Sequence, residues 1–338
     1  MLQQKIPQSD KHLLISLIVP FRNEQTHVVQ LVDSLRKQNY PSQKLQVIFV
    51  NDHSTDETKS LLTNLPSHFF MLDLTESIGK KAAITLGVEK ADGEIIVTTD
   101  ADCAHPPDWI QSINNQFGNP KLQFLVGAVS IRSNSFFSNL QAIEFSSLIG
   151  SGAALLHWNA PTMANGANLA FRRDAFLMMN GYEGNQHIPS GDDEFLLRKV
   201  YQKFPDGVLF NNDEKAVVFT EPQPSLGAFF QQRLRWASKW RYNTSLLTKL
   251  IAIVVFLFQI GIISLFIAVS IYPNRLLQII VFSKLAIDGI FLWRISTFLK
   301  SKFSIFPFIV LEFVYPIYVI VIALLSQFIP YKWKDRIF

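Results

Sequence analysis

Residues 250–272 constrain this chain more than any other feature, because these 23 residues contain no charged side chain. A helix of about 20 apolar residues is long enough to cross the hydrocarbon core of a bilayer. A buried helix in a soluble domain is rarely free of charge over such a length. The sequence therefore predicts a membrane-spanning helix here and argues against a wholly soluble protein.

Two further segments of the C-terminal third are also apolar. Residues 305–329 contain a single charge, Glu312, whereas residues 276–299 include Lys284 and Asp288, which lie four positions apart. Side chains at that spacing can pair on one face of a helix, which lowers the cost of placing them in a membrane. We predict three spans, at 250–272, 276–299 and 305–329, and a two-span arrangement without the middle segment stays open.

Basic residues predict which side of the membrane the rest of the chain occupies. The short loop after the first predicted span contains one basic residue, Arg275, whereas five basic residues lie shortly before that span. They are Arg233, Arg235, Lys239, Arg241 and Lys249. Because loops rich in lysine and arginine stay in the cytoplasm, we expect an integral protein of the inner or plasma membrane with its N-terminal region cytoplasmic. The same rule does not choose between two spans and three.

The N-terminal two thirds of the chain alternate between strand-like and helix-like patterns. Short apolar runs alternate with segments of helical spacing, an order that indicates an α/β domain with a mostly parallel sheet covered by helices. The predicted strands are 14–19, 45–50, 69–74 and 94–98, and the predicted helices are 24–38 and 79–90. Ligands of such sheets bind at the carboxyl ends of the strands.

Two carboxylates follow the last of these strands directly. Asp100 and Asp102 are two residues apart, so in an extended segment their side chains point the same way and repel each other. Carboxylate oxygens are ligands for Mg²⁺ or Mn²⁺, and such an ion would relieve the repulsion and could bridge to a diphosphate. An Asp-x-Asp pair is weak evidence alone, so the companion motifs decide its meaning.

Charge and cysteine content exclude several other classes. The formal net charge of +4 suits an anionic membrane surface or an anionic substrate, but it is too small and scattered to indicate nucleic-acid binding. The single cysteine, Cys103, excludes an intramolecular disulfide and a cysteine-based zinc site.

Four companion motifs accompany the Asp-x-Asp pair in a consistent order. They are VPFRNE at 19–24, VNDHSTD at 50–56, GDDEFL at 191–196 and QRLRW at 232–236. Together with TTDADC at 98–103, they resemble the family 2 inverting glycosyltransferases, and most of all the membrane-attached branch that includes ceramide glucosyltransferase and bacterial polysaccharide synthases. The resemblance implies a GT-A-like, nucleotide-sugar-binding domain over residues 13–241, after an N-terminal tail at 1–12.

The resemblance assigns the nucleotide pocket to residues at the ends of the first two strands. Pro20, Glu24 and Asp52 would shape this pocket, and Asp52 would read the uracil ring of a UDP-sugar donor. Lys80 or Lys81 would lie near the diphosphate.

The remaining roles that the resemblance implies belong to the chemistry. Asp100 would face the ribose, Asp102 would hold the metal, and Asp193 matches the catalytic aspartate of a Glu-Asp pair. In this chain Asp192 stands where glutamate is commoner, which leaves Asp193 in register.

The last motif would serve the acceptor and the diphosphate, through Gln232, Arg235 and Trp236. Trp236 and Trp240, with two neighbouring phenylalanines, could equally form an amphipathic helix at the membrane surface, and the two interpretations are compatible. Residues 165–168 resemble the loop before the catalytic aspartate, as a structural turn or an acceptor contact. Asp56 is expected to cap a helix rather than bind a ligand.

The expected reaction is the displacement of a nucleoside diphosphate from an anomeric carbon. It needs positive charge on the phosphates and a base for the attacking hydroxyl, and a direct displacement inverts the anomeric centre. We expect transfer from a UDP-sugar to a hydroxyl of a lipid-linked or saccharide acceptor.

Three alternatives stay open. A polyprenyl-phosphate glycosyltransferase usually lacks the Gln-x-x-Arg-Trp motif. A processive polysaccharide synthase extrudes its polymer, and two or three membrane-spanning helices are few for building a channel. A nucleotidyltransferase shares the fold class and the metal-binding acids, but it leaves the motif beside the membrane anchor unexplained.

Overall fold

A computed structural model of the 338-residue chain describes residues 11–186, 188, 190–239, 245–272, 274–330, 332–333 and 336–337. Most of the predicted N-terminal tail lies outside these residues, as do Trp240 and Arg241. The chain forms two compact units, of which the first contains Met1–Ser130 and Ser151–Glu221, and the second contains Ile131–Gly150 and Pro222–Phe338. The predicted catalytic region, residues 13–241, therefore includes segments of both units.

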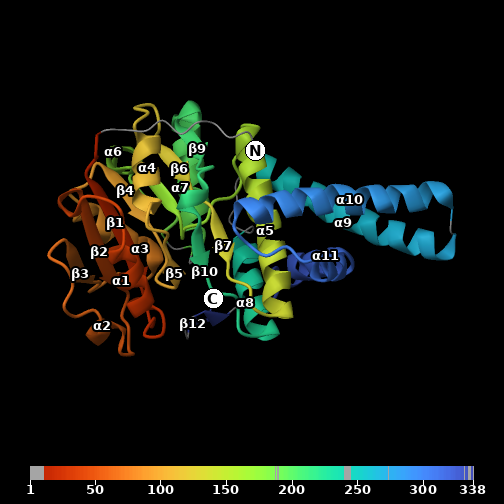
Figure 1. The fold of residues 1–338 in the computed structure, drawn as a ribbon, viewed down its shortest axis with the longest axis horizontal. Coiled ribbons are helices and arrows are strands. Elements are labelled where there is room, and N and C mark those ends of the chain that lie inside the picture. Colours follow the sequence, from red (N-terminus) through yellow and green to blue (C-terminus); the bar gives the residue numbers. More distant parts are fainter. Residues whose placement is uncertain are drawn as a thin grey trace. The chain divides into compact units, whose positions relative to one another are not determined.

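The first unit is built on a seven-stranded sheet with the order β3-β2-β1-β4-β8-β6-β9 (Figure 1). Its strands are β1 (Ile15–Phe21), β2 (Leu45–Asn51), β3 (Phe69–Asp73), β4 (Ile95–Thr98), β6 (Phe124–Val126), β8 (Leu169–Arg172) and β9 (Val208–Phe210). The first four are parallel, which confirms the four strands predicted from apolar runs. β8 runs antiparallel to both β4 and β6, so the complete sheet is mixed.

Both helices predicted for the first unit are present, although the first is shorter than the predicted 24–38. α1 (Val28–Arg36) buries Val28, Leu31, Val32 and Leu35, one apolar stripe at helical spacing. α3 (Lys80–Glu89) matches the predicted helix at 79–90. The remaining helices are α2 (Thr58–Leu61), α4 (Trp109–Phe117), α6 (Arg173–Met178) and α7 (Asp192–Lys203), with 3₁₀ turns at Ser42–Lys44, Pro205–Gly207 and Glu214–Ala216. A small sheet adds β5 (Cys103–Ala104), β10 (Val218–Thr220) and β7 (Val129–Ile131).

Pro20 lies in the central strand β1, just beyond the point where β1 and β4 stop pairing. β1 pairs with β4 only as far as Ile18 opposite Thr98, whereas its pairing with β2 continues through Pro20 opposite Val50. Proline has no N–H to donate, so it is tolerated where a neighbouring strand has already ended. The strand order of the sheet changes direction between β1 and β4. Ligands of α/β sheets bind at the carboxyl ends of the strands at such a point.

The second unit is mainly helical. It contains most of α5 (Phe136–His157), with α8 (Leu226–Ser238), α9 (Leu246–Ile271), α10 (Arg275–Phe298) and α11 (Ile305–Leu325), and a short hairpin of β11 (Lys332–Trp333) and β12 (Arg336–Ile337). Among the described residues, α9, α10 and α11 are the three helices long and apolar enough to cross a membrane. In Figure 1, α9 and α10 run beside each other across the view, whereas α11 is seen nearly end on.

Charged residues inside two of these apolar helices are paired with each other. Lys284 and Asp288 of α10 form the predicted ion pair, with 3.1 Å between Nζ and Oδ2. Lys284 also pairs with Glu312 of α11, a partner that the sequence did not suggest. Pairing lowers the cost of holding these charges in an apolar layer and links α10 to α11.

Candidate active site

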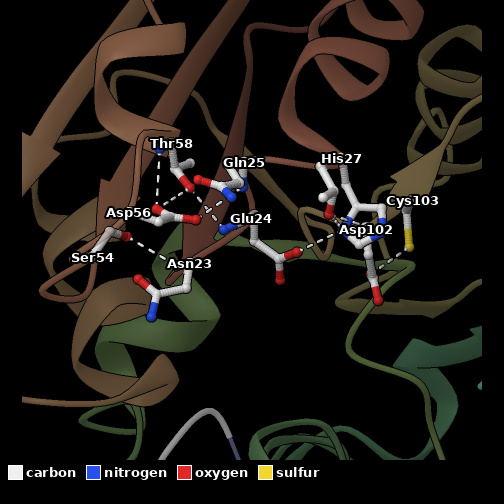
Figure 2. A network of polar contacts seen from close by, with 10 residues as sticks. Asn23, Glu24, Gln25, His27, Ser54, Asp56, Thr58, Asp102 and Cys103 are labelled. Atoms are coloured by element: carbon white, nitrogen blue, oxygen red, sulfur yellow. Dashed lines mark hydrogen bonds and ion pairs between the residues drawn. The ribbon is translucent and has the colours of Figure 1, made fainter.

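Side-chain hydrogen bonds join the loops that follow β1 and β2 (Figure 2). Asn23 Oδ1 accepts a hydrogen bond from the N–H of Thr55 at 2.8 Å, and the N–H of Asn23 donates to Ser54 Oγ at 3.1 Å. The N–H of Glu24 donates to Thr58 Oγ1 at 2.7 Å. Because side chains of each loop accept hydrogen bonds from backbone N–H groups of the other, the two loops hold each other in a fixed position.

Asp56 joins the same two loops and precedes α2, whose N-cap residue is Glu57. Its Oδ1 accepts from the N–H of Thr58 at 3.0 Å, and its Oδ2 accepts from the N–H of Gln25 at 3.1 Å. Burial acts to raise the pKa of Asp56, but the hydrogen bonds from Thr58 and Gln25 outweigh it and lower that pKa. The carboxylate thus stays charged and accepts the N–H of Thr58, the first residue of α2, from one position before the N-cap residue Glu57.

Asp52 lies at the end of β2 with only 3% of its surface exposed. Its Oδ1 is 3.2 Å from His53 Nδ1, and Arg22 donates to the backbone carbonyls of Asp52 and His53 at 2.8 and 2.6 Å. The arginine fixes the backbone where His53 adopts a left-handed conformation, with φ of 58°. A buried carboxylate held in this way can accept N–H donors from a planar ring.

Glu24 and Asp102 lie in the same polar network, together with His27 (Figure 2). Glu24 Oε2 is 2.9 Å from His27 Nδ1. Cys103 Sγ donates to Asp102 Oδ1 at 3.6 Å, and burial, followed by the charges of Asp102 and Asp100, raises the pKa of the thiol. The cysteine is therefore a neutral donor beside the aspartate.

Lys80, the first residue of α3, joins two acidic segments of the first unit. Its Nζ is 2.6 Å from Asp100 Oδ1 after β4 and 3.1 Å from Asp192 Oδ2 at the start of α7. Burial acts to lower the pKa of Lys80, but Asp100 and Asp192 outweigh it and raise that pKa. Burial likewise acts to raise the pKa of Asp192, and Lys80 reverses this. Lys80 and Asp192 therefore both stay charged near neutral pH.

Asp193 is oriented by two backbone donors. Its Oδ1 accepts from the N–H of Glu194 at 2.7 Å, and its Oδ2 accepts from the N–H of Gly166 at 3.3 Å. Gly191, which precedes Asp192 and Asp193, has a φ of 80°, a conformation that favours glycine. The turn at Gly191 starts α7, and acids in the first turn of a helix are favoured by its dipole.

The loop at residues 165–168 holds Asp193 and Lys80 in place. Thr98 and Thr99, at the end of β4, donate through their hydroxyls to the carbonyls of Gly166 at 3.3 Å and Ala167 at 2.9 Å. A Cβ atom on Gly166 would lie 2.6 Å from Lys80 Nζ and 2.8 Å from the Asp192 carboxylate. The glycine therefore permits the close approach of these charges, which gives the loop a structural role.

Lys81 has different surroundings from Lys80. Its side chain is buried, and Nζ donates to the backbone carbonyls of Asn185 at 2.7 Å and Ile188 at 2.9 Å. Its ammonium also lies 4.8 Å from the centre of the Phe195 ring. Of the two lysines, Lys80 is the one that contacts the acids at the strand end.

Asp100 and Asp102 are the carboxylates that would supply the protein's share of a divalent-cation site. Within the described part of the chain, no group of three or more His, Cys, Asp or Glu side chains is arranged to hold a metal ion. Mg²⁺ typically takes one or two carboxylates together with phosphate oxygens and water, so two aspartates are a sufficient protein share.

The buried His105 side chain contacts Thr99, whose hydroxyl holds the loop at residues 165–168. His105 Nε2 is 2.7 Å from Thr99 Oγ1, and Nδ1 is 3.2 Å from Ser34 Oγ. Burial lowers the pKa of His105 to about 3, far below its usual value near 6.5. Between these values the unfolded chain binds a proton that the native protein does not, so stability falls as the pH drops below about 6.5.

We therefore expect the melting temperature in detergent to fall between pH 7.5 and pH 5, and His105→Gln to reduce this fall. Each pH unit inside the window costs about 1.4 kcal/mol for one such group. His68, whose pKa burial also lowers, acts in the same direction and is present in both proteins. An equal fall in both proteins would contradict the role of His105.

The Gln-x-x-Arg-Trp motif lies on α8 in the second unit. Gln232 Oε1 accepts a hydrogen bond from the neighbouring Arg233, and the ring of Trp236 lies 6.0 Å from that of Phe145. Arg233 binds Glu144 of α5, a residue that sequence reasoning missed because the pair is 89 positions apart. The apolar, serine-rich sequence around Glu144 gave no signal beyond an isolated acid.

Comparison with known proteins identifies the domain. Residues 16–178 match the Glycosyl transferase family 2 description. The chain carries a family 2 glycosyl transferase domain. The matched range includes Pro20, Glu24, Asp52, Asp100 and Asp102 of the transferase domain. Asp193 and the α8 motif follow it in the chain.

Relatives of the transferase domain include a poly-beta-1,6-N-acetyl-D-glucosamine synthase of Staphylococcus aureus, 26% identical over 228 residues that cover 66% of this chain and 53% of the relative. A probable glycosyltransferase of Sulfolobus acidocaldarius is 25% identical over 236 residues, covering 66% and 49%. The chain thus spans about half the length of the curated relatives it matches.

A solved structure shares the fold. The mannosyltransferase of Pyrobaculum calidifontis, in complex with GDP-Man and Mn²⁺, superimposes with a TM-score of 0.62 at 18% identity, covering 95% of this chain and 89% of that one. The transferase domain therefore has the expected GT-A-like architecture, followed by three apolar helices.

Proposed function

We propose that this protein is a membrane-bound inverting glycosyltransferase that moves a sugar from a UDP-sugar to a hydroxyl of a lipid-linked or saccharide acceptor. The ion pairs of Lys80 carry the proposal. They connect Asp100, at the strand end where nucleotides bind, with Asp192, the neighbour of Asp193. Donor-side and base-side carboxylates thus belong to one charged cluster.

Donor binding falls to the joined loops after β1 and β2 and to the end of β4. The buried Asp52 carboxylate can accept the N–H of uracil, with Pro20 and Glu24 shaping the pocket around the base. Asp100 would accept from the ribose hydroxyls. Lys80, rather than the buried Lys81, would turn to the diphosphate, because its ammonium already lies among the acids of the strand end.

Asp102, with Asp100 beside it, would hold Mg²⁺ or Mn²⁺. When bound, the ion supplies positive charge that neutralises the departing diphosphate. The related fold of the mannosyltransferase, which holds Mn²⁺, agrees with this choice of ion.

Asp193 is the proposed general base. Its carboxylate is oriented by the N–H groups of Gly166 and Glu194, so it can take the proton of an acceptor hydroxyl as that oxygen attacks the anomeric carbon. A single displacement from an α-linked donor yields a β-linked product. Gln232, Arg235 and Trp236 are assigned to the acceptor and diphosphate on the resemblance of their motif alone.

A processive synthase is the second candidate. It is favoured by the polysaccharide synthase among the relatives, which suggests a saccharide acceptor. Transfer of one sugar and repeated transfer use the same donor chemistry, so the size of the product separates them.

Membranes that contain the protein should be incubated with a panel of radiolabelled UDP-, GDP- and CDP-sugars, and the lipid and polymer products separated. We expect transfer from a UDP-sugar, because uracil offers the N–H that Asp52 accepts. Guanine also offers N–H groups, so transfer only from a GDP-sugar would correct the donor without changing the reaction. Nucleotide transfer to a sugar phosphate would replace the proposal with a nucleotidyltransferase.

The proposed location makes a separate prediction. A reporter that is active only in the cytoplasm should be active when fused after Lys249, because nucleotide sugars are made in the cytoplasm. With three spans, the same reporter fused after Phe338 should be inactive. Activity at both positions would contradict the three-span arrangement, and inactivity after Lys249 would contradict the cytoplasmic orientation.

A further inference from the structure

A buried ion pair joins α5 and α8 of the second unit. Arg233 donates to Glu144 through Nε at 3.1 Å and through Nη2 at 2.5 Å, so both carboxylate oxygens are bound. The side chains of both residues are only 4% exposed. A two-point bond between an arginine and a carboxylate fixes distance and direction together, which a lysine could not do.

Arg233 also contacts two residues of the Gln-x-x-Arg-Trp motif. Its Nη1 donates to Gln232 Oε1, and its guanidinium lies 4.3 Å from the centre of the Trp236 ring. The guanidinium also lies 4.4 Å from the centre of the Phe229 ring. One buried side chain thus sets the orientation of both an amide and an indole.

Glu144, in turn, is held from α11. The hydroxyl of Tyr318 donates to Glu144 Oε1 at 3.4 Å, and its ring packs against Phe229 and Phe230 of α8. Leu234 of α8 packs against Ile322 of α11 as well. The last apolar helix therefore contacts the ion pair directly.

We propose that Glu144 and Arg233 are positioning residues that hold Gln232 and Trp236 of α8 in their reactive orientation, with Tyr318 completing the arrangement from α11. The inference rests on the proposed glycosyl transfer, in which Gln232 and Trp236 serve the acceptor. According to this inference, Glu144 and Arg233 affect turnover through the orientation of Gln232 and Trp236, separately from their effect on the stability of the fold.

The two parts can be separated because both charges are buried. Removing one partner leaves an unpaired buried charge and destabilises the protein, whereas removing both charges leaves stability much less changed. Glu144→Gln and Arg233→Gln should therefore each lower the melting temperature in detergent, and the double variant should recover most of that loss. The double variant still lacks the two-point bond and the guanidinium that contacts both rings.

The expected result is that the double variant regains thermal stability but not turnover. We expect its kcat to stay about 10–100-fold below wild type, since small misplacements near a reaction centre cost this much. Its donor KM should change much less than its kcat, because the groups proposed to bind the nucleoside of the donor lie in the first unit. A double variant that recovers both stability and kcat would overturn the inference and leave the pair a structural role only.

Hydrogen exchange of the full-length protein gives a readout that does not depend on activity. Amides of α8 should exchange faster in the double variant than in wild type, while those of α3 should not change. If wild type transfers no sugar but α8 still loosens, the proposed function fails and the positioning contacts stand. Unchanged exchange in α8 would overturn the inference whatever the activity.

An exposed arginine–carboxylate pair provides the matched control. Arg36 and Asp33 of α1 are separated by 4.0 Å and have side chains that are 43% and 57% exposed. Exposed pairs contribute little, so Arg36→Gln with Asp33→Asn should leave stability, kcat and the exchange of α8 unchanged.

Discussion

Asp102→Asn is expected to lower turnover by about 10³-fold or more while leaving the protein folded and inserted. The substitution keeps the shape of the side chain but removes a charge that would hold the divalent cation. Loss of several kcal/mol of stabilisation of the leaving diphosphate corresponds to a factor of this size. Turnover should be measured with saturating donor, alongside the melting temperature.

The neighbour of Asp102 provides the control for this variant. Cys103 donates to the carboxylate as a neutral thiol, so Cys103→Ser keeps a donor there and should retain most of the activity. Wild-type turnover that persists undiminished in excess chelator would contradict the metal role. A low melting temperature for Asp102→Asn would instead point to a structural role of the carboxylate.

Asp193→Asn should lower turnover by about 10²–10⁴-fold, the usual contribution of a general base. Two backbone N–H groups donate to the side chain, so the amide oxygen of asparagine can accept one of these hydrogen bonds and the loop should stay in place. The affinity for UDP should change little, because the proposed nucleotide contacts involve Asp52 and Asp100. Calorimetry of UDP binding and single-turnover kinetics would separate the two effects.

Asp192→Asn is the matched comparison, one position away. Asp192 is bound to Lys80, so its loss should affect Lys80 and the diphosphate more than the attacking hydroxyl. If Asp192→Asn loses turnover and Asp193→Asn keeps it, the base is Asp192. If neither variant loses turnover, the acceptor itself carries an anion, and the polyprenyl-phosphate alternative becomes the better description.

The first half of the sheet could be predicted from the sequence because its strands are short apolar runs that alternate with segments of helical spacing. β8 could not, since Leu169–Arg172 is only four residues long and pairs antiparallel with β4, outside the parallel pattern. α5 was also missed. Its sequence has apolar residues on every side, so it lacks the one-sided periodicity that identifies a surface helix.

Motif spacing identified the segments of the candidate site, but it could not separate adjacent residues. Lys80 and Lys81 are neighbours on α3 and point about 100° apart, so only the fold shows that one contacts Asp100 and the other contacts backbone carbonyls. The partner of Arg233 was beyond prediction for a related reason. Pairing with Glu144 depends on how α5 and α8 pack.

The passage of α5 from one unit into the other limits how this protein can be prepared. Its residues Ile143 and Glu144 are covered by Leu292, Phe308 and Arg233, all of which come after Glu221, the last residue of the first unit. A shortened protein ending at Glu221 would keep α5 but expose an apolar surface around an unpaired carboxylate. Expression of such a fragment should yield aggregates, so purification has to start from detergent-extracted membranes with the whole chain intact.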